Sequence, residues 1–181
     1  MLNSSLEKPS IIPPSPWVVA HLARIPKNSE VLDLACGQGR HSRLLAAAGH
    51  RVLAVDRDAD ALATLQGIAG VCCQRMELEG EDWPLADRQF AAVVVTNYLW
   101  RARLPELLAL VQPGGVLIYE TFMVGNAAYG KPSRPDFLLQ PGELRQVITA
   151  AGLQEIDFCE GYVEQPKPAM RQAICAVRPL R

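Results

Sequence analysis

The sequence predicts an α/β protein with a doubly wound, mostly parallel, seven-stranded sheet that ends in an antiparallel hairpin. Short aliphatic runs alternate with helical segments between residues 31 and 119, which is the pattern of βαβ units. The run from 90 to 95 is entirely apolar, as expected of a strand buried on both faces. Two final strands, at 153–161 and 170–177, are separated by a connection too short for a crossover, so they must be antiparallel.

The size and composition of the chain indicate one domain. Residues 1–14 are polar and then proline-rich, so we expect a flexible arm there and a single domain over residues 15–181. The balance of 18 basic and 19 acidic residues gives a net charge of −1, which does not indicate a nucleic-acid partner.

Cysteine usage and hydropathy bear on metals and location. The five cysteines are scattered and form no C-x-x-C pair, so we expect reduced thiols and no metal site. No signal peptide and no membrane-spanning apolar run are visible. A cytoplasmic protein without a membrane partner is therefore expected.

The elements can be justified in order along the chain. Ser15 and Pro16 have the pattern of an N-cap and a first helical residue, so a short helix is expected over 17–25. Gly49 is expected to end the helix that follows the first strand. The sequence Pro113-Gly114-Gly115 predicts a tight turn. The remaining strands are expected at 31–34, 52–55, 71–74, 90–95 and 116–119, and the remaining helices at 59–66, 104–111 and 141–151.

A small-residue loop follows the first predicted strand. Its glycines, Gly37 and Gly39, let the backbone approach a ligand and leave N–H groups and a helix N-terminus free to bind it. Asp56 lies about twenty positions further on, at the end of the next strand, where it can accept both hydroxyls of a ribose. This unit predicts a nucleoside-containing cofactor at the carboxyl edge of the sheet.

Two residues make this loop different from a dinucleotide-binding fingerprint. Ser42 stands where the fingerprint has its last glycine or alanine, and Asp33 lies in the strand that leads into the loop. A carboxylate is unfavourable beside a pyrophosphate but favourable beside a cation. S-adenosylmethionine carries an ammonium and a sulfonium and no phosphate, so it is preferred over a nicotinamide cofactor.

The run D-L-A-C-G-Q-G-R-H at 33–41, followed by A-V-D at 54–56, resembles the first two motifs of class I S-adenosylmethionine-dependent methyltransferases. Those enzymes have a Rossmann-like fold. The short chain, G-R-H after the glycines and Y-E-T-F at 119–122 resemble the small bacterial tellurite-resistance methyltransferases. The resemblance extends over about residues 31–121 and implies S-adenosyl-L-methionine as the cofactor.

The resemblance also implies which residues bind the cofactor. Glu77 stands where the family has an acidic residue for the adenine amino group, with the Leu78 backbone beside it, whereas residues 79–82 are expected to form a solvated acidic loop. Arg40 can meet the carboxylate of the cofactor. The expected set is Asp33, Ala35, Gly37, Gly39, Arg40, Asp56, Arg57, Glu77, Leu78 and Thr96.

The residues that follow the fourth and fifth strands are expected at the same edge, where doubly wound folds bind ligands. Either Trp17 and His21 form part of a lid, or Trp17 is an ordinary packing residue and His21 lies on the surface. The long segment 123–139, with Tyr129, Lys131 and Arg134, is expected to cover the substrate. The expected substrate pocket consists of Trp17, Asn97, Tyr98, Trp100, Glu120 and Phe122.

The resemblance implies methyl transfer to a small-molecule acceptor, such as a thiol or a chalcogen oxyanion. A hydroxyl or amine acceptor would need a base, for which His41, Glu120 and Tyr98 are candidates, but no catalytic residue is assigned. The alternatives are RNA or protein methylation with a partner, and a non-catalytic cofactor-binding subunit. The sequence T-N-Y-L at 96–99 lacks the N-P-P-aromatic signature of base methylation. Neither the acceptor nor the oligomeric state follows from the sequence.

Overall fold

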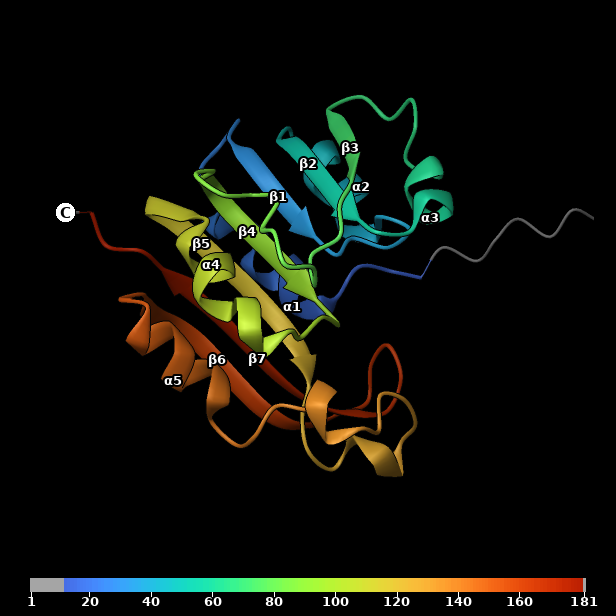
Figure 1. Ribbon diagram of the computed structural model, residues 1–181, viewed down its shortest axis with the longest axis vertical. Coiled ribbons are helices and arrows are strands. Elements are labelled where there is room, and N and C mark those ends of the chain that lie inside the picture. Colours follow the sequence, from blue (N-terminus) through green and yellow to red (C-terminus); the bar gives the residue numbers. More distant parts are fainter. Residues whose placement is uncertain (1–11, 181) are drawn as a thin grey trace, which may run out of the picture.

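The computed structural model describes residues 12–180, so the part of the predicted arm at 1–11 lies outside the described residues. The sheet has the order β3-β2-β1-β4-β5-β7-β6 (Figure 1). The first five strands pair in parallel, and β7 pairs antiparallel with both β5 and β6. The predicted fold class is confirmed. The strands are β1 (Glu30–Leu34), β2 (Arg51–Asp56), β3 (Val71–Arg75), β4 (Phe90–Thr96), β5 (Val111–Phe122), β6 (Gln154–Val163) and β7 (Ala169–Val177).

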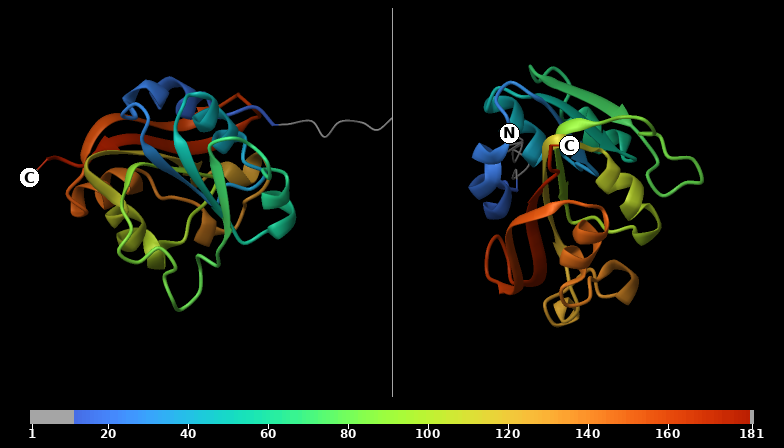
Figure 2. Two further views of the ribbon diagram at one scale, coloured as in Figure 1. Left: turned by 90° about the horizontal axis from the view of Figure 1, so that it is seen from above. Right: turned by 90° about the vertical axis from the view of Figure 1, so that its left-hand side faces the viewer.

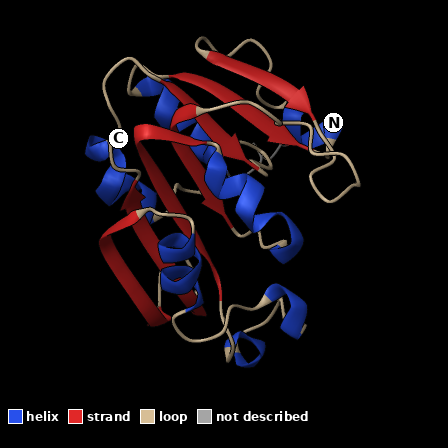
Figure 3. Cartoon of the chain, turned by 60° about the vertical axis from the view of Figure 1, so that its left-hand side comes forward, coloured by secondary structure: helices blue, strands red, loops and turns tan. Residues whose placement is uncertain are grey.

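Helices cover both faces of the sheet, with α1 and α2 on one side and α4 and α5 on the other (Figures 2 and 3). The α-helices of the described residues are α1 (Pro16–His21), α2 (Arg40–Ala47), α3 (Ala59–Ala63), α4 (Leu104–Ala109) and α5 (Glu143–Ala150). Short 3₁₀ turns follow or connect them: η1 (Leu22–Arg24), η2 (Arg101–Arg103), η3 (Asn126–Ala128) and η4 (Pro135–Phe137). None of the helices within residues 12–180 has the length and apolar character needed to cross a membrane.

The core lies in two layers because neighbouring side chains of a strand point to opposite faces. Val94 packs with Val18 of α1 and Leu45 of α2. Val95 packs in the other layer, which contains Leu107 of α4. β4 is the central strand of the sheet, and all seven of its residues are buried. The site forms at the edge of the sheet where this strand ends.

Local signals define the helix ends. The Ser15 hydroxyl accepts a hydrogen bond from the Trp17 N–H at 3.1 Å, so the predicted N-cap is confirmed. Gly49 follows α2 with a φ of 90°, in the left-handed region as expected. The helix α3 ends at Ala63, three residues before the predicted end at Gln66.

The predicted turn at 113–115 lies inside β5, which begins at Val111, where the pairing with β4 is irregular: Val111 pairs with Phe90, and Val116 pairs with Ala92. The Gly114 N–H donates to the Arg178 carbonyl at 2.7 Å, and the Arg178 N–H donates to Gly115 at 2.9 Å. A Cβ on Gly115 would lie 3.0 Å from the Phe90 carbonyl oxygen. Gly114, with a φ of 75°, permits this local bend, and Gly115 also allows the close approach of the Gln112 and Phe90 carbonyl oxygens.

Candidate active site

A cavity of about 890 Å³ lies at the carboxyl ends of β1 and β4, the crevice that the sequence predicts. Its walls come from the loop before α2, the first turns of α2, the ends of β4 and β5, and the start of β7. Residues 12–13 and the β6–β7 turn at 165–167 complete it. The lining residues are Ile12, Pro13, Ala35, Cys36, Gly37, Gln38, Gly39, Arg40, Arg43, Thr64, Thr96, Asn97, Phe122, Gln165, Pro166, Lys167 and Arg171.

The loop before α2 holds three residues in the left-handed region: Ala35 with a φ of 54°, Gly37 with 54° and Gly39 with 71°. The two glycines have different physical reasons. A Cβ on Gly37 would meet no atom within 4 Å, so this backbone faces open space, whereas a Cβ on Gly39 would lie 2.3 Å from Leu65 Cδ2. Gly37 therefore leaves room for a ligand, and Gly39 allows the loop to pack on the buried Leu65.

The carboxylate of Asp56 is fixed at the end of β2. It accepts hydrogen bonds from the Gly37 N–H at 2.7 Å and from the Asp58 N–H at 2.9 Å. These bonds orient a half-buried acceptor beside the glycine loop, as a ribose diol requires. Asp56 does not itself line the cavity.

The predicted adenine-side residues lie next to Asp56 along the same edge. The Met76 N–H donates to the Asp56 carbonyl at 2.9 Å, which brings the segment after β3 to this position. Leu78 is buried, whereas Glu77 is exposed and accepts from the Glu79 N–H at 3.0 Å. Arg57 forms a loose ion pair with Glu79 at 3.8 Å. None of these residues lines the cavity.

Asp33 lies beneath the loop and is 1% exposed. Ser42 donates a hydrogen bond from its hydroxyl to Asp33 Oδ2 at 2.5 Å. Burial outweighs this bond and the positive charge of Arg40, and raises the pKa of Asp33 from 3.8 to about 6. The two residues that distinguish this loop from a dinucleotide fingerprint are therefore one hydrogen-bonded pair, and they support the loop from below instead of lining the cavity.

His41 connects the cavity to the N-terminal segment. Its Nε2 accepts a hydrogen bond from the Ser15 N–H at 3.0 Å, and its Nδ1 lies 3.3 Å from Thr96 Oγ1. Burial, followed by the charge of Arg40, lowers the pKa of His41 to about 3. The ring is thus neutral, with its proton on Nδ1. Because both nitrogens are engaged, His41 is a structural link and not the free base that the sequence allows.

Arg171 lines the cavity but was not among the site residues predicted from the sequence. It lies near the start of β7 and pairs with Phe122 in the antiparallel register. Its Nη1 donates to Asn97 Oδ1 at 2.7 Å and lies 3.8 Å from Glu120 Oε1. The available signal was topological: a last strand antiparallel to its neighbour must begin at the carboxyl edge, so its first basic residue reaches the site.

Four predicted substrate contacts do not line the cavity: Trp17, Tyr98, Trp100 and Glu120. Trp17 packs against the α1–α2 core layer, as the packing alternative expects. His21 is buried instead of lying on the surface, and its ring contacts Asp157 Oδ2 of β6 at 3.0 Å. Burial and the carboxylates of Glu79 and Glu77 raise the pKa of Tyr98, whose side chain therefore faces the adenine side.

The segment 123–139 also lies away from the cavity lining. Asn126 holds it in place, donating from Nδ2 to the Pro132 carbonyl at 2.9 Å and accepting from the Met170 N–H at 3.1 Å. Tyr129, Lys131 and Arg134 are exposed. The expected cover is instead provided by residues 12–13 and 165–167, because the β6–β7 turn projects over the same edge as the ends of β4 and β5.

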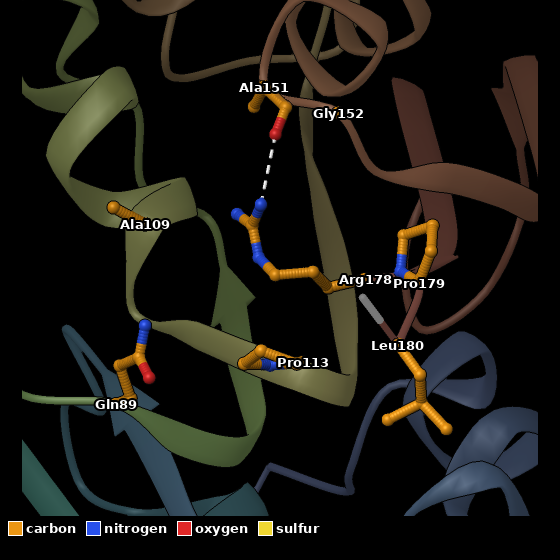
Figure 4. Close-up of a pocket in the computed structure, with 8 residues that line it drawn as sticks. All are labelled: Gln89, Ala109, Pro113, Ala151, Gly152, Arg178, Pro179 and Leu180. Carbon is orange, nitrogen blue, oxygen red and sulfur yellow. Dashed lines mark hydrogen bonds between the residues drawn. The ribbon is translucent and has the colours of Figure 1, made fainter.

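A second cavity, of about 690 Å³, lies at the opposite edge of the sheet, where β4 and β5 begin (Figure 4). Arg178 crosses it and donates to the carbonyls of Leu108, Val111 and Ala151 at 2.8, 2.7 and 3.1 Å. A cation here caps the carboxyl ends of α4 and α5. Each of the three guanidinium nitrogens therefore donates to a carbonyl, and Arg178 holds the ends of the two helices together.

Comparison with known proteins agrees with this geometry. A family described as a methyltransferase domain matches residues 31–115, which include the glycine loop, Asp56 and Thr96. Residues 31–115 are thus similar to a methyltransferase domain, and the fold is shared with the solved structure of TehB. The resemblance of the glycine-loop motifs is thereby confirmed.

The curated and structural relatives of this chain differ in length from it. Malonyl-[acyl-carrier protein] O-methyltransferase of Pectobacterium atrosepticum is 34% identical over 113 residues, which are 58% of this chain and 44% of that protein. TehB of Haemophilus influenzae has a TM-score of 0.72 at 19% identity, over 88% of this chain and 61% of that one. The chain thus spans less than two thirds of either relative, and the TehB likeness shows the fold alone.

S-adenosylmethionine is the cofactor of class I methyltransferases, and the donor set here fits it. A solved structure of Burkholderia thailandensis 1,6-didemethyltoxoflavin-N1-methyltransferase contains S-adenosylhomocysteine; it has a TM-score of 0.67 at 19% identity, over 91% of this chain and 77% of that one. In the present chain the open space before Gly37 admits a ligand, and Asp56 offers an acceptor for a ribose. Arg40 lines the cavity and offers a cation to a carboxylate.

Proposed function

We propose that this chain transfers a methyl group from S-adenosylmethionine to a small-molecule acceptor, with thiols and chalcogen oxyanions as the first acceptors to test. The observation that carries the proposal is the cavity of about 890 Å³ that joins the glycine loop to the ends of β4, β5 and β7. Its size is in the range of small-molecule sites, which are about 300–1,000 Å³.

The residues of the chain bind and align, and none of them needs to be a strong base. When bound, S-adenosylmethionine would supply a methyl group carried on a sulfonium: a lone pair of the acceptor attacks the methyl carbon in line, the carbon–sulfur bond breaks, and S-adenosylhomocysteine leaves with a neutral thioether. Asp56 and the loop at 35–39 hold the nucleoside end, and Thr96 and Asn97 border the space next to it. Alignment of two bound reactants is itself a large source of rate enhancement.

The surroundings of the cavity favour a small acceptor over a macromolecule. Pro13 accepts a hydrogen bond from Arg40 Nη1 at 3.1 Å, so the N-terminal segment closes one side. The turn at 165–167 closes another. The net charge of −1 offers no extended basic surface for a nucleic acid.

Calorimetric titration with S-adenosylhomocysteine tests the proposal, with NADH as the competing cofactor class. We expect S-adenosylhomocysteine to bind near micromolar, about −8 kcal/mol, and NADH not to bind. Asp56→Ala removes the ribose acceptor and should weaken binding at least about tenfold. Asp60→Ala, at an exposed position in the first turn of α3, is the matched control and should bind like the parent.

An acceptor screen with thiols and chalcogen oxyanions then follows the appearance of S-adenosylhomocysteine. NADH binding, or an unchanged affinity of Asp56→Ala, would contradict the cofactor assignment. Tight S-adenosylhomocysteine binding without turnover on any small acceptor would instead support the alternative of a non-catalytic subunit or of a macromolecular substrate.

A further inference from the structure

The Arg171 guanidinium is held rigidly at the wall of the cavity. Arg171 is 5% exposed, and its Cζ lies 4.2 Å from the centre of the Phe122 ring, so one face of the guanidinium is covered. Nη1 donates to Asn97 Oδ1 at 2.7 Å. Asn97 adopts a φ of 56°, a left-handed conformation that asparagine tolerates better than most residues. The guanidinium plane is therefore fixed before any ligand arrives.

One edge of this guanidinium has no hydrogen-bond partner among the described residues. Within residues 12–180, Arg171 Nε is buried and has no hydrogen-bond partner, and Nη2 makes no hydrogen bond either. These two nitrogens lie on the same side of the group and point their N–H bonds in parallel. A buried donor without a partner is costly, and such a fork matches two oxygens of one anionic group.

The charge of the residues that line the cavity also favours an anionic ligand. Four cations line it (Arg40, Arg43, Lys167 and Arg171), and its lining contains no aspartate or glutamate of the described residues. Glu120 lies beside Arg171 at 3.8 Å but outside the lining, where it offsets part of the buried positive charge. A bound S-adenosylmethionine would add a net positive charge, and an anionic acceptor would then be attracted further.

We propose that the Nε and Nη2 edge of Arg171 is a subsite for a carboxylate or similar oxyanion of the methyl acceptor. The inference rests on the proposed function and adds the chemical class of the acceptor to it. Arg171 binds the anionic group and Phe122 keeps the fork in plane. Asn97 occupies the other edge so that only one anion is bound.

The test measures anion binding by the complex with S-adenosylhomocysteine, with sodium acetate and sodium phosphate as probes and sodium chloride at equal ionic strength as reference. The melting temperature of the complex is followed as the concentration of each salt rises. We expect acetate or phosphate to stabilise the complex beyond chloride in a saturable way. The relative effect of acetate and phosphate shows which oxyanion the subsite prefers.

Charge-conserving variants separate the fork from general attraction. Arg171→Lys keeps the positive charge and removes the fork, so the half-saturating acetate or phosphate concentration should rise at least about tenfold. Arg43→Lys makes the same exchange elsewhere in the cavity and should leave that concentration within about twofold. Phe122→Leu removes the ring behind the guanidinium and should also weaken the anion effect, which provides a second variant if Arg171→Lys folds poorly.

The outcomes distinguish the two proposals. Failure of the parent protein to bind S-adenosylhomocysteine would contradict the proposed function. Normal binding of S-adenosylhomocysteine, with acetate and phosphate acting no differently from chloride, would overturn only the subsite. Equal weakening by Arg171→Lys and Arg43→Lys would overturn it as well, because it would leave only the summed charge of the cavity.

Discussion

Replacing Asp33 by asparagine should stabilise the free protein at neutral pH. The carboxyl is buried under the glycine loop, and its pKa is raised from 3.8 to about 6. At about 1.4 kcal/mol per pKa unit, ionising Asp33 inside the fold costs about 3 kcal/mol. Ser42 can still donate its hydrogen bond to the asparagine oxygen, so the variant keeps this contact and loses the cost of the charge.

The sign of the pH dependence follows from linkage. The folded state holds the proton of Asp33 more tightly than the unfolded state does. The contribution of this group to the free energy of unfolding therefore falls as pH rises from 3.8 to about 6, and it is constant above that. Asparagine has no such dependence. The variant should equal the parent near pH 4 and exceed it by about 2–3 kcal/mol at about pH 7.5.

Urea denaturation of parent and variant, paired at about pH 4.5, 6 and 7.5, measures this difference while the other titrating groups cancel. Asp82→Asn, in an exposed loop, is a control that should change the stability by the same small amount at each pH. A difference between the parent and Asp33→Asn that does not grow with pH would refute the assignment of the raised pKa to Asp33.

Three further predictions concern stability and pH. Gly39→Ala should destabilise the fold by about 2–3 kcal/mol in urea denaturation, because its Cβ would overlap the buried Leu65 at a φ of 71°; an unchanged midpoint would contradict the close packing of the loop. Arg178→Met should cost about 2–4 kcal/mol by the same assay, because three carbonyls lose a charged donor, while calorimetry should show unchanged S-adenosylhomocysteine affinity. The pKa of His41 is lowered from 6.5 to about 3, so the unfolded chain takes up a proton below pH 6.5 that the folded chain does not. The parent should therefore lose about 2 kcal/mol of stability from this group between about pH 7 and 5, a loss that His41→Gln should not show.

Local patterns were sufficient for the parts of the molecule whose structure depends on neighbours in sequence. The glycine loop, the N-cap at Ser15 and the buried run of β4 lie where their residue types require. The sequence Pro113-Gly114-Gly115 forms an irregular stretch inside β5, and its glycines also serve contacts with Phe90 and Arg178, which are distant in the chain. Glycine has several structural uses, and only the neighbours in space tell them apart.

Some residues of the site could likewise be predicted from the sequence, and others could not. The residues at the ends of β1, β2 and β4 follow from the rule that parallel strands share a carboxyl edge, so Gly37, Asp56 and Thr96 were predictable. The direction of a side chain after the end of a strand has no such rule. Asn97 lines the cavity, whereas its neighbour Tyr98 turns toward Glu77 and Glu79.

The sequence by itself determined the sheet, the cofactor loop and the acidic residue that faces it, because hydrophobic periodicity and glycine placement act over a few neighbouring residues. Only the tertiary structure decided that Ser42 partners Asp33, that His41 is locked between Ser15 and Thr96, and that Arg171 enters the cavity. These contacts join residues that strand order and packing bring together. Whether a buried donor such as Arg171 Nε lacks a hydrogen-bond partner can be seen only when all of its neighbours in space are known.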